Sequence, residues 1–209
     1  VFIPNMPEYA VIFMGVAAVG GINTTVNSLY STADLVHQFT DSGAKFLITI
    51  PEFLDRALPA ANQCGIEEII VLGEAEGTTP FTALLDNDGN APDVDIDPRN
   101  DLVALPYSSG TTGLSKGVML THENLIANMV LACEMNAVLP EDRLIGVLPF
   151  FHIYGMVLIL NLAVYLGLTL VTMLRFDLEQ FLELVQKYKI TSLNLVPPLV
   201  LALAKHPVV

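Results

Sequence analysis

A loop rich in glycine and hydroxyl side chains is the part of this sequence whose residue types point most clearly to chemistry. The stretch from Tyr107 to Val118 reads YSSGTTGLSKGV, with three glycines, five serines or threonines, one lysine and no acidic residue. Glycines let the backbone adopt positive φ and approach a ligand closely, and successive backbone N–H groups in such turns form anion-binding concavities. With the hydroxyl donors and the charge of Lys116, this composition predicts a cradle for a triphosphate or pyrophosphate.

The loop does not match the Walker A motif. That motif requires GxxxxGK followed by Ser or Thr and then a helix, whereas Lys116 stands between Ser115 and Gly117. Both flanks have the composition of strands. The alternative interpretation is a flexible hairpin with one unrelated lysine, but the order of the residues favours the phosphate cradle. We therefore expect the loop to join two strands, with no helix beginning at Lys116 or Gly117.

A second candidate group lies in the aromatic segment LPFFHIYG, which spans residues 148–155 and contains His152, Tyr154 and Gly155. A single histidine among aromatic side chains is commonly a hydrogen-bonded core residue, so the segment by itself leaves the role of His152 open. The pair Pro197-Pro198 follows an apolar run and is interpreted first as a structural strand-to-helix turn.

The elements that must position these residues alternate between helices and short apolar strands. This alternation indicates an α/β fold, with layers of mostly parallel sheets flanked by helices. The expected helices cover residues 7–19, 33–42, 51–64, 121–138, 153–166, 177–188 and 198–205. The expected strands cover residues 45–50, 67–72, 102–107, 118–120, 144–148, 168–174 and 192–196.

One stretch interrupts this alternation. Residues 73–100 are rich in Gly, Pro, Asn and acidic residues, with Arg99 as the single basic residue, which predicts a solvated surface excursion. We therefore divide the chain into a first α/β portion (1–72), the excursion (73–100) and a portion with the loop and the aromatic segment (101–209). We expect both ends of this sequence to be internal to a longer protein.

Composition excludes several classes of function. The chain is 53% hydrophobic and 15% charged, and its net charge is 9 − 22 = −13. Such an acidic chain is a poor candidate for nucleic-acid binding or for an anionic membrane surface. Cys64 and Cys133 lack metal-site or disulfide spacing and predict reduced, buried thiols in a cytoplasmic protein. The uncharged run 156–174 is interrupted by polar residues and predicts a buried helix–strand pair instead of a membrane span.

The stretch LPYSSGTTGLSKGVMLTH at residues 105–122 resembles the signature loop of the adenylate-forming superfamily. This superfamily includes acyl- and aryl-CoA ligases, beetle luciferases and the adenylation domains of peptide synthetases. The resemblance continues through the aromatic segment, RFD at 175–177 and VPP at 196–198, and so covers essentially the whole chain. The 4-coumarate–CoA ligase-like enzymes are the most similar group. Ser115 stands where the family usually has proline, which bears on the loop's affinity.

The resemblance implies an internal fragment of the large N-terminal domain, without the lysine-bearing C-terminal domain. It implies that ATP and a carboxylic acid form an acyl-adenylate, that CoA as co-substrate then gives a thioester, and that Mg²⁺ accompanies the phosphates. It implies a catalytic and substrate-pocket role for His152, an acyl-pocket wall at Tyr154 and Gly155, and no protein metal ligand. The implied phosphate-binding residues are Ser108, Ser109, Gly110, Thr111, Thr112, Gly113, Lys116 and Gly117.

Two alternatives to the CoA ligase stay open. One is an adenylation domain that loads a carrier protein, or a luciferase-like oxygenase, and the other is a non-catalytic nucleotide-binding remnant. For the ligase we expect a hydroxycinnamate-like or medium-chain acid, with the acid, ATP, CoA and the remainder of its own chain as partners. We also expect these 209 residues alone not to complete the reaction.

Overall fold

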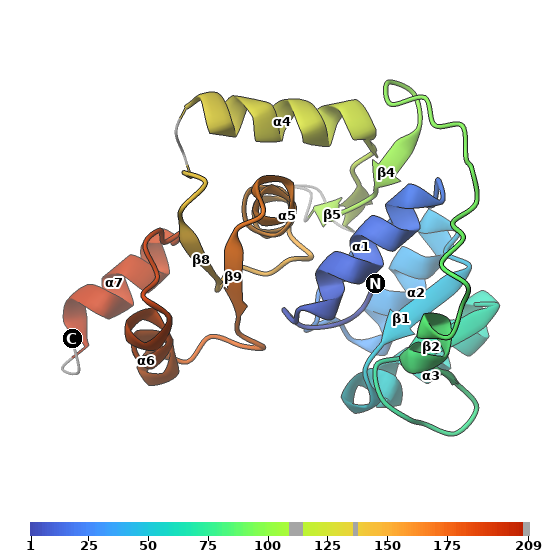
Figure 1. Cartoon of the computed structure of the whole chain (residues 1–209). Coiled ribbons are helices and arrows are strands. Elements are labelled where there is room, and N and C mark those ends of the chain that lie inside the picture. Colours follow the sequence, from blue (N-terminus) through green and yellow to red (C-terminus); the bar gives the residue numbers. More distant parts are fainter. Residues whose placement is uncertain (109–114, 136–137, 207–209) are drawn as a thin grey trace. The chain divides into compact units, whose positions relative to one another are not determined.

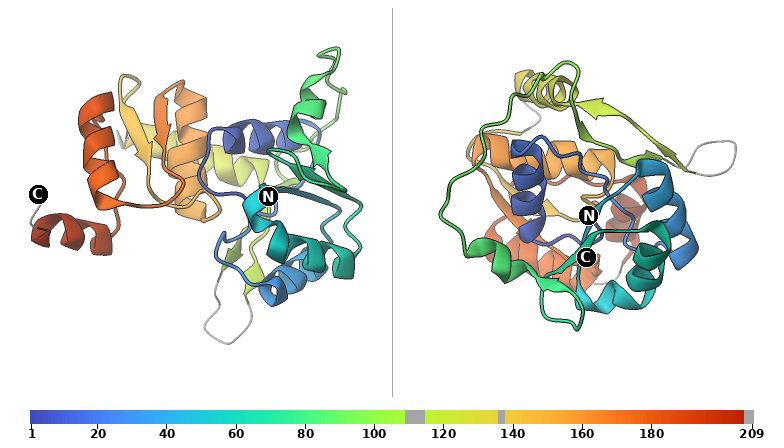
Figure 2. Two further views of the ribbon diagram at one scale, coloured as in Figure 1. Left: turned by 90° about the horizontal axis from the view of Figure 1, so that it is seen from below. Right: turned by 90° about the vertical axis from the view of Figure 1, so that its right-hand side faces the viewer.

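The computed structural model describes residues 1–108, 115–135 and 138–206, and Figures 1 and 2 show their helices and strands. The chain forms two units, one comprising Val1–Ile3 and Ile12–Glu123 and the other comprising Pro4–Val11 and Asn124–Val209. Each unit contains parallel strands and helices, so the expected α/β class is confirmed. The boundaries drawn at residues 72 and 100 stay a prediction.

A three-stranded parallel sheet organises the first unit. Strand β1 (Phe46–Thr49) pairs with β2 (Glu68–Val71), and β2 pairs with β3 (Thr79–Pro80). Ile48 lies opposite Ile70. The first two strands match the sequence expectation to within one residue at each end. Strand β3 was not expected, because its short Thr-Pro sequence lies in the acidic excursion and becomes a strand only through its partner β2.

Helices α2 (Thr32–Ser42) and α3 (Leu54–Cys64) pack against each other, and α3 follows a 3₁₀ turn at Pro51–Phe53. Helix α1 (Glu8–Ala18) contributes residues to both units. Burial of apolar side chains between these elements is the main stabilising term of such a layer. The buried cluster comprises Phe2, Val26, Leu35, Phe39, Leu47, Ala57, Ala60 and Ala61.

Helix α2 has strong local end signals, which is why its bounds were predictable. The Ser31 side chain accepts from the backbone N–H of Asp34, and the Asp34 carboxylate accepts from the backbone N–H of Ser31 in a capping box. At the other end, Gly43 adopts φ 62°, a left-handed conformation that glycine takes without steric cost.

Two short antiparallel pairs follow the excursion. Strand β4 (Leu102–Ala104) pairs with β7 (Leu120–Thr121), and β5 (Tyr107–Ser108) pairs with β6 (Lys116–Gly117). The single expected strand over 102–107 is therefore two strands, and the one expected over 118–120 is replaced by β6 and β7. A 3₁₀ helix, Phe81–Leu85, lies within the excursion.

The second unit is built on a parallel pair, β8 (Arg143–Gly146) and β9 (Thr169–Thr172). The crossover between them contains a π-helical segment, Gly155–Asn161, followed by α5 (Leu162–Leu166). The sequence predicted one continuous helix here, because its apolar pattern does not report the wider i→i+5 hydrogen bonding of a π-helix. The crossover confirms that the uncharged run is a helix–strand pair.

Three more helices belong largely to this unit: α4 (His122–Glu134), α6 (Leu178–Tyr188) and α7 (Pro197–Lys205). As expected, Asp177 caps α6, its side chain accepting from Gln180 N–H. The strand expected over 192–196 is wrong, because only Ser192 bridges to Leu144. An extended apolar run becomes a strand only where a neighbour supplies backbone partners.

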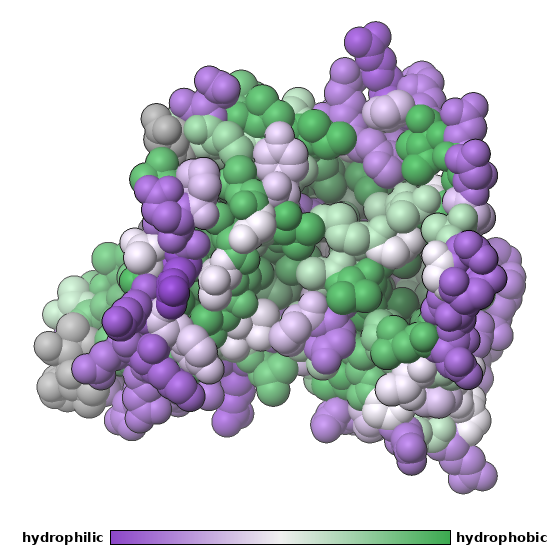
Figure 3. Space-filling view, in the orientation of Figure 1, coloured by the Kyte–Doolittle hydropathy of each residue, from purple (hydrophilic) through white to green (hydrophobic). Residues whose placement is uncertain are grey.

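The surface of the described chain is rich in apolar side chains. Figure 3 shows apolar side chains at the surface, and Leu131, Met135 and Leu174 of the second unit are each more than half exposed. Extended apolar surface is typical of contact sites for further polypeptide. The two cysteines are free but half-buried, which corrects the expectation of full burial. None of the described helices has the length and hydropathy to cross a membrane.

The glycines in α1 and in the π-helical segment give a matched test of packing. A Cβ at Gly155 would overlap the carbonyl oxygen of Pro149, whereas a Cβ at Gly15 would have no neighbour within 4 Å. We expect Gly155→Ala to lower the free energy of unfolding by about 2–4 kcal/mol, because the backbone must move apart. Gly15→Ala should be neutral or stabilising by up to about 1 kcal/mol. Urea unfolding monitored by circular dichroism measures both, and equal effects would contradict the packing at Gly155.

Candidate functional site

The predicted phosphate loop joins two strands, as expected. Strands β5 and β6 pair antiparallel, with Tyr107 opposite Gly117 and Ser108 opposite Lys116. The hairpin thus brings the Ser108 and Lys116 positions next to each other, and Lys116 is exposed. The other predicted phosphate contacts lie outside the described residues: Ser109, Gly110, Thr111, Thr112 and Gly113.

Gly117 has a packing role in this hairpin. A Cβ at Gly117 would lie 3.1 Å from Leu105 Cδ1 and 3.3 Å from Tyr107 Cε2. Such distances are tighter than ordinary van der Waals contacts between carbon atoms. The absence of a side chain at Gly117 therefore lets the Tyr107 ring and the Leu105 side chain lie close to the backbone of β6.

Helix α2 contacts both strands of the hairpin. The Nε2 atom of His37 lies 2.9 Å from the Ser115 carbonyl oxygen, and the Tyr107 hydroxyl donates to Asp41 Oδ2 at 2.5 Å. Burial, followed by the bond to the Asp41 carboxylate, raises the pKa of Tyr107 well above its usual value, so the hydroxyl stays protonated at neutral pH and acts as donor.

The aromatic segment in the second unit is held by Asn5. The Asn5 Nδ2 group donates to the carbonyl oxygens of Gly146 and Leu148 at 2.9 and 2.8 Å, and its Oδ1 accepts from Phe150 N–H at 2.8 Å. Asn5 is buried, and the buried Phe150 ring packs edge-to-face on Tyr9 with centroids 5.7 Å apart. Three backbone groups just before His152 are therefore fixed by one side chain.

His152, Tyr154 and Gly155 lie together where the crossover helix begins. His152 is exposed, and its Nδ1 accepts from Tyr154 N–H at 3.3 Å, so Nε2 is the nitrogen that carries hydrogen in the neutral ring. The Tyr154 hydroxyl donates to Asn194 Oδ1 at 3.1 Å. Gly155 is buried against the Pro149 carbonyl, so packing also explains its missing side chain.

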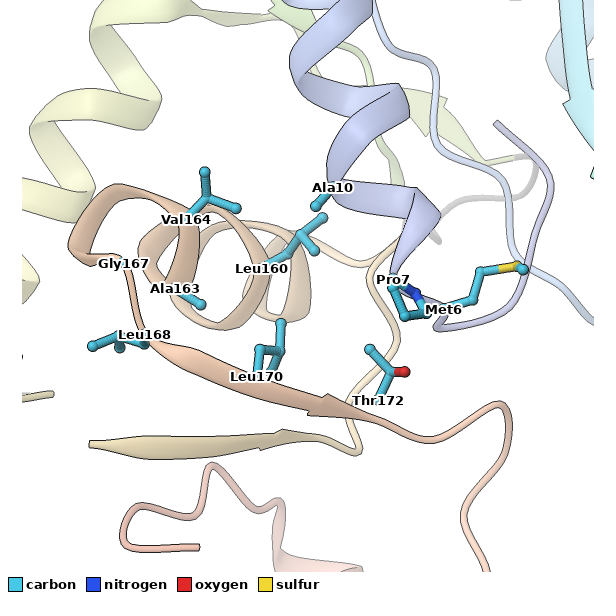
Figure 4. Close-up of a pocket in the computed structure, with 10 residues that line it drawn as sticks. All are labelled: Met6, Pro7, Ala10, Leu160, Ala163, Val164, Gly167, Leu168, Leu170 and Thr172. Carbon is cyan, nitrogen blue, oxygen red and sulfur yellow. The ribbon is translucent and has the colours of Figure 1, made fainter. Parts of the chain in front are cut away.

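A cavity of about 350 Å³ in the second unit does not include these residues (Figure 4). Figure 4 shows its walls at the start of α1, along the helical crossover and on β9. Among the side chains that line it, only that of Thr172 is polar, and the lining residues are Met6, Pro7, Ala10, Leu160, Ala163, Val164, Gly167, Leu168, Leu170 and Thr172. Among the described residues, no three His, Cys, Asp or Glu side chains form a metal site.

Four residues that contact the candidate site segments were not predicted from the sequence: Asn5, His37, Asp41 and Asn194. Their partners lie between 40 and 145 positions away in the chain, so no local pattern reports them. The spacing of His37 and Asp41 was the one available signal, because residues four apart share a helix face.

Comparison with known proteins gives one consistent result. The AMP-binding enzyme family matches residues 1–209. The chain is 42% identical over 214 residues to 4-coumarate–CoA ligase 2 of Solanum tuberosum, covering 100% of this chain and 39% of that protein. The chain therefore spans about two fifths of the length of this relative.

Solved structures agree with this comparison. A long-chain-fatty-acid–CoA ligase from Archaeoglobus fulgidus is 31% identical, with a TM-score of 0.87, over 94% of this chain and 39% of that chain. The ATP-bound MatB from Rhodopseudomonas palustris is 27% identical, with a TM-score of 0.85, over 99% of this chain and 40% of that chain.

Replacement of Asn5 tests how the aromatic segment is held. We expect Asn5→Ala to lower the free energy of unfolding by about 2–4 kcal/mol, because one buried N–H and two buried carbonyls lose their partner. Asn5→Asp should also destabilise, since an ionised carboxylate cannot donate to the two carbonyl oxygens. Asn87→Ala is the matched control, because Asn87 is exposed. Thermal unfolding distinguishes these cases, and an unchanged Asn5→Ala variant would refute this role.

Proposed function

We propose, because this chain belongs to the AMP-binding enzyme family, that it supplies the triphosphate-binding hairpin and one wall of the acid pocket of an AMP-forming acid–thiol ligase. The observation that carries the proposal is the β5–β6 hairpin, which presents Lys116 next to Ser108 at the mouth of a glycine- and hydroxyl-rich loop. Its chemistry supports polyphosphate binding, since lysine and hydroxyl groups donate to phosphate oxygens.

The proposed reaction has two steps. A carboxylate oxygen attacks the α-phosphorus of ATP, which forms an acyl-adenylate and releases pyrophosphate. The thiolate of CoA then attacks the acyl carbon, and AMP leaves with the bonding electron pair. Negative charge develops on the leaving pyrophosphate in the first step, and preorganised donors at the hairpin stabilise it without rearranging. Ser108 and Lys116 are the described residues that we assign to this task.

His152 is proposed to orient the reacting acid. Its Nδ1 is occupied by the Tyr154 backbone N–H, so the Nε2–H of the neutral ring can donate to a carboxylate or adenylate oxygen. Holding the carboxylate close to the α-phosphate converts an encounter between two molecules into a positioned reaction, which accounts for a large share of such rate enhancements.

Mg²⁺ is proposed to arrive bound to the phosphates. The described side chains of the hairpin are hydroxyl and ammonium groups, which suit an anion, whereas Mg²⁺ prefers carboxylates and phosphate oxygens. The ion would neutralise charge on the phosphates. Lys116 would then contribute the protein's own positive charge at the same place.

The proposed acid is hydroxycinnamate-like or of medium chain length. Support comes from the aromatic Tyr154, whose hydroxyl has a partner in Asn194, and from the similarity to a 4-coumarate–CoA ligase. An aromatic wall favours flat, apolar ligands. Acetate offers too little apolar surface to fill such a pocket and should be a poor substrate.

Pyrophosphate exchange tests the proposal directly. In the whole protein that contains this chain, we expect acid-dependent ATP–pyrophosphate exchange with 4-coumarate or octanoate, and little with acetate. Lys116→Met should raise the KM for ATP by about tenfold or more, because one charge-assisted contact to phosphate is lost. Lys45→Met is the control, since Lys45 forms an exposed ion pair with Glu67. No exchange with any acid, or best exchange with acetate, would contradict the proposal.

The isolated chain is expected to bind phosphates weakly and to release little pyrophosphate. Affinity from one end of a ligand is low, because the ordering cost falls on few contacts. Pyrophosphate release should be measured for these 209 residues and for the whole protein with the same acid and ATP. We expect the isolated chain to be slower by a factor of about a thousand or more, since most positioning is lost. Comparable rates would show that the catalytic residues all lie within this chain.

A further inference from the structure

We infer that helix α2 is a clamp on the phosphate hairpin, with His37 and Asp41 as positioning residues that set the affinity for ATP. Neither residue belongs to the loop itself. The inference rests on the proposed function, because it assumes that the hairpin between β5 and β6 binds the triphosphate. It adds a second element, far away in sequence, on which that binding depends.

The two contacts flank the candidate phosphate-binding residues. The His37 bond reaches the carbonyl of Ser115, the residue before Lys116, while the Asp41 bond reaches Tyr107, the residue before Ser108. Because a carbonyl oxygen can only accept, the His37 Nε2 must carry the hydrogen of this bond. One helix face therefore holds both strands of the hairpin, each at the position next to its proposed phosphate contact.

The ring of Tyr107 also contacts the His37 ring. Its centroid lies 6.3 Å from that of His37 with an interplanar angle of 88°, an edge-to-face arrangement. On its other side, Gly117 leaves room for the ring. The hydroxyl bond to the Asp41 carboxylate is charge-assisted and short, and so restrains the ring more than a neutral bond would.

The helix that carries the clamp is itself fixed. Leu35 and Phe39 are buried in the core of the first unit. Gln38, also buried, donates to Thr24 Oγ1 and to the Thr25 carbonyl at 2.8 and 3.1 Å. A binding group is most effective when the residues supporting it are locked by packing and hydrogen bonds, and α2 meets this requirement.

The test uses the whole protein with His37→Ala, Asp41→Ala and Tyr107→Phe, and measures the Kd for MgATP by calorimetry. We expect each variant to bind ATP about tenfold more weakly, because hairpin order must then be gained on binding. The Asp41→Ala/Tyr107→Phe double variant should be no weaker than either single one, since both remove the same bond. Asp41→Asn keeps an acceptor and should retain most of the affinity.

Two measurements distinguish the clamp from a merely structural role of His37 and Asp41. The melting temperature should stay within a few degrees of the wild-type value, and the KM for the acid should stay within about twofold. The loss of affinity is then confined to ATP. Thr40→Ala is the control, because Thr40 lies on α2 and its hydroxyl contacts Cys64. Additive losses in the double variant, or equal losses for ATP and acid, would overturn the clamp.

The same experiment keeps the two proposals apart. If the wild type binds ATP but shows no pyrophosphate exchange, the ligase function fails, whereas weaker ATP binding by the variants would still support the clamp. If exchange is intact and ATP binding by His37→Ala and Asp41→Ala is unchanged, the clamp is wrong and the ligase function stands.

Discussion

The buried carboxamide of Gln38 is the interaction on which the layout of the first unit depends. It donates to Thr24 Oγ1 and the Thr25 carbonyl, and the Thr24 hydroxyl donates in turn to the carbonyl of Leu105 at 3.1 Å. These bonds link α2 to the segment at residues 24–25 and, through Thr24, to the entry of the hairpin. Asn5 has the corresponding role before His152 in the second unit. In both units, a buried side-chain amide donates to backbone carbonyl groups of another segment.

These buried amides also explain why proposed binding groups can lie at the ends of very short strands. A hairpin with two residues on each side has little stability of its own. Its position must therefore come from neighbours, here from the Leu105 contact on one side and from His37 and Asp41 on the other. The conformational entropy lost on ordering the hairpin is then lost during folding, and it does not weaken ligand binding.

The sequence predicted what local chemistry encodes. The ends of α2 and α6 followed from Ser31, Gly43 and Asp177, and the join of the loop to two strands followed from its flanks. The unpaired segment 192–196, the added strand β3 and the π-helical crossover escaped prediction, because each depends on a neighbour that local patterns do not specify. The contacts of His37 and Asn5 escaped for the same reason. The binding and catalytic roles of all the predicted site residues stay predictions: loop residues 108–113, Lys116, Gly117, His152, Tyr154 and Gly155.

The crowding at Gly155 has an evolutionary consequence. The backbone of Pro149 occupies the volume of any larger side chain there, so a larger residue at this position could not reshape the proposed acid pocket without disturbing the fold. In the proposed pocket, changes of specificity would instead fall on exposed neighbours such as Tyr154 and its partner Asn194, because substitutions at exposed positions usually cost little stability. The residues at the start of the crossover helix would then stay constant, while the proposed pocket wall beside them varies.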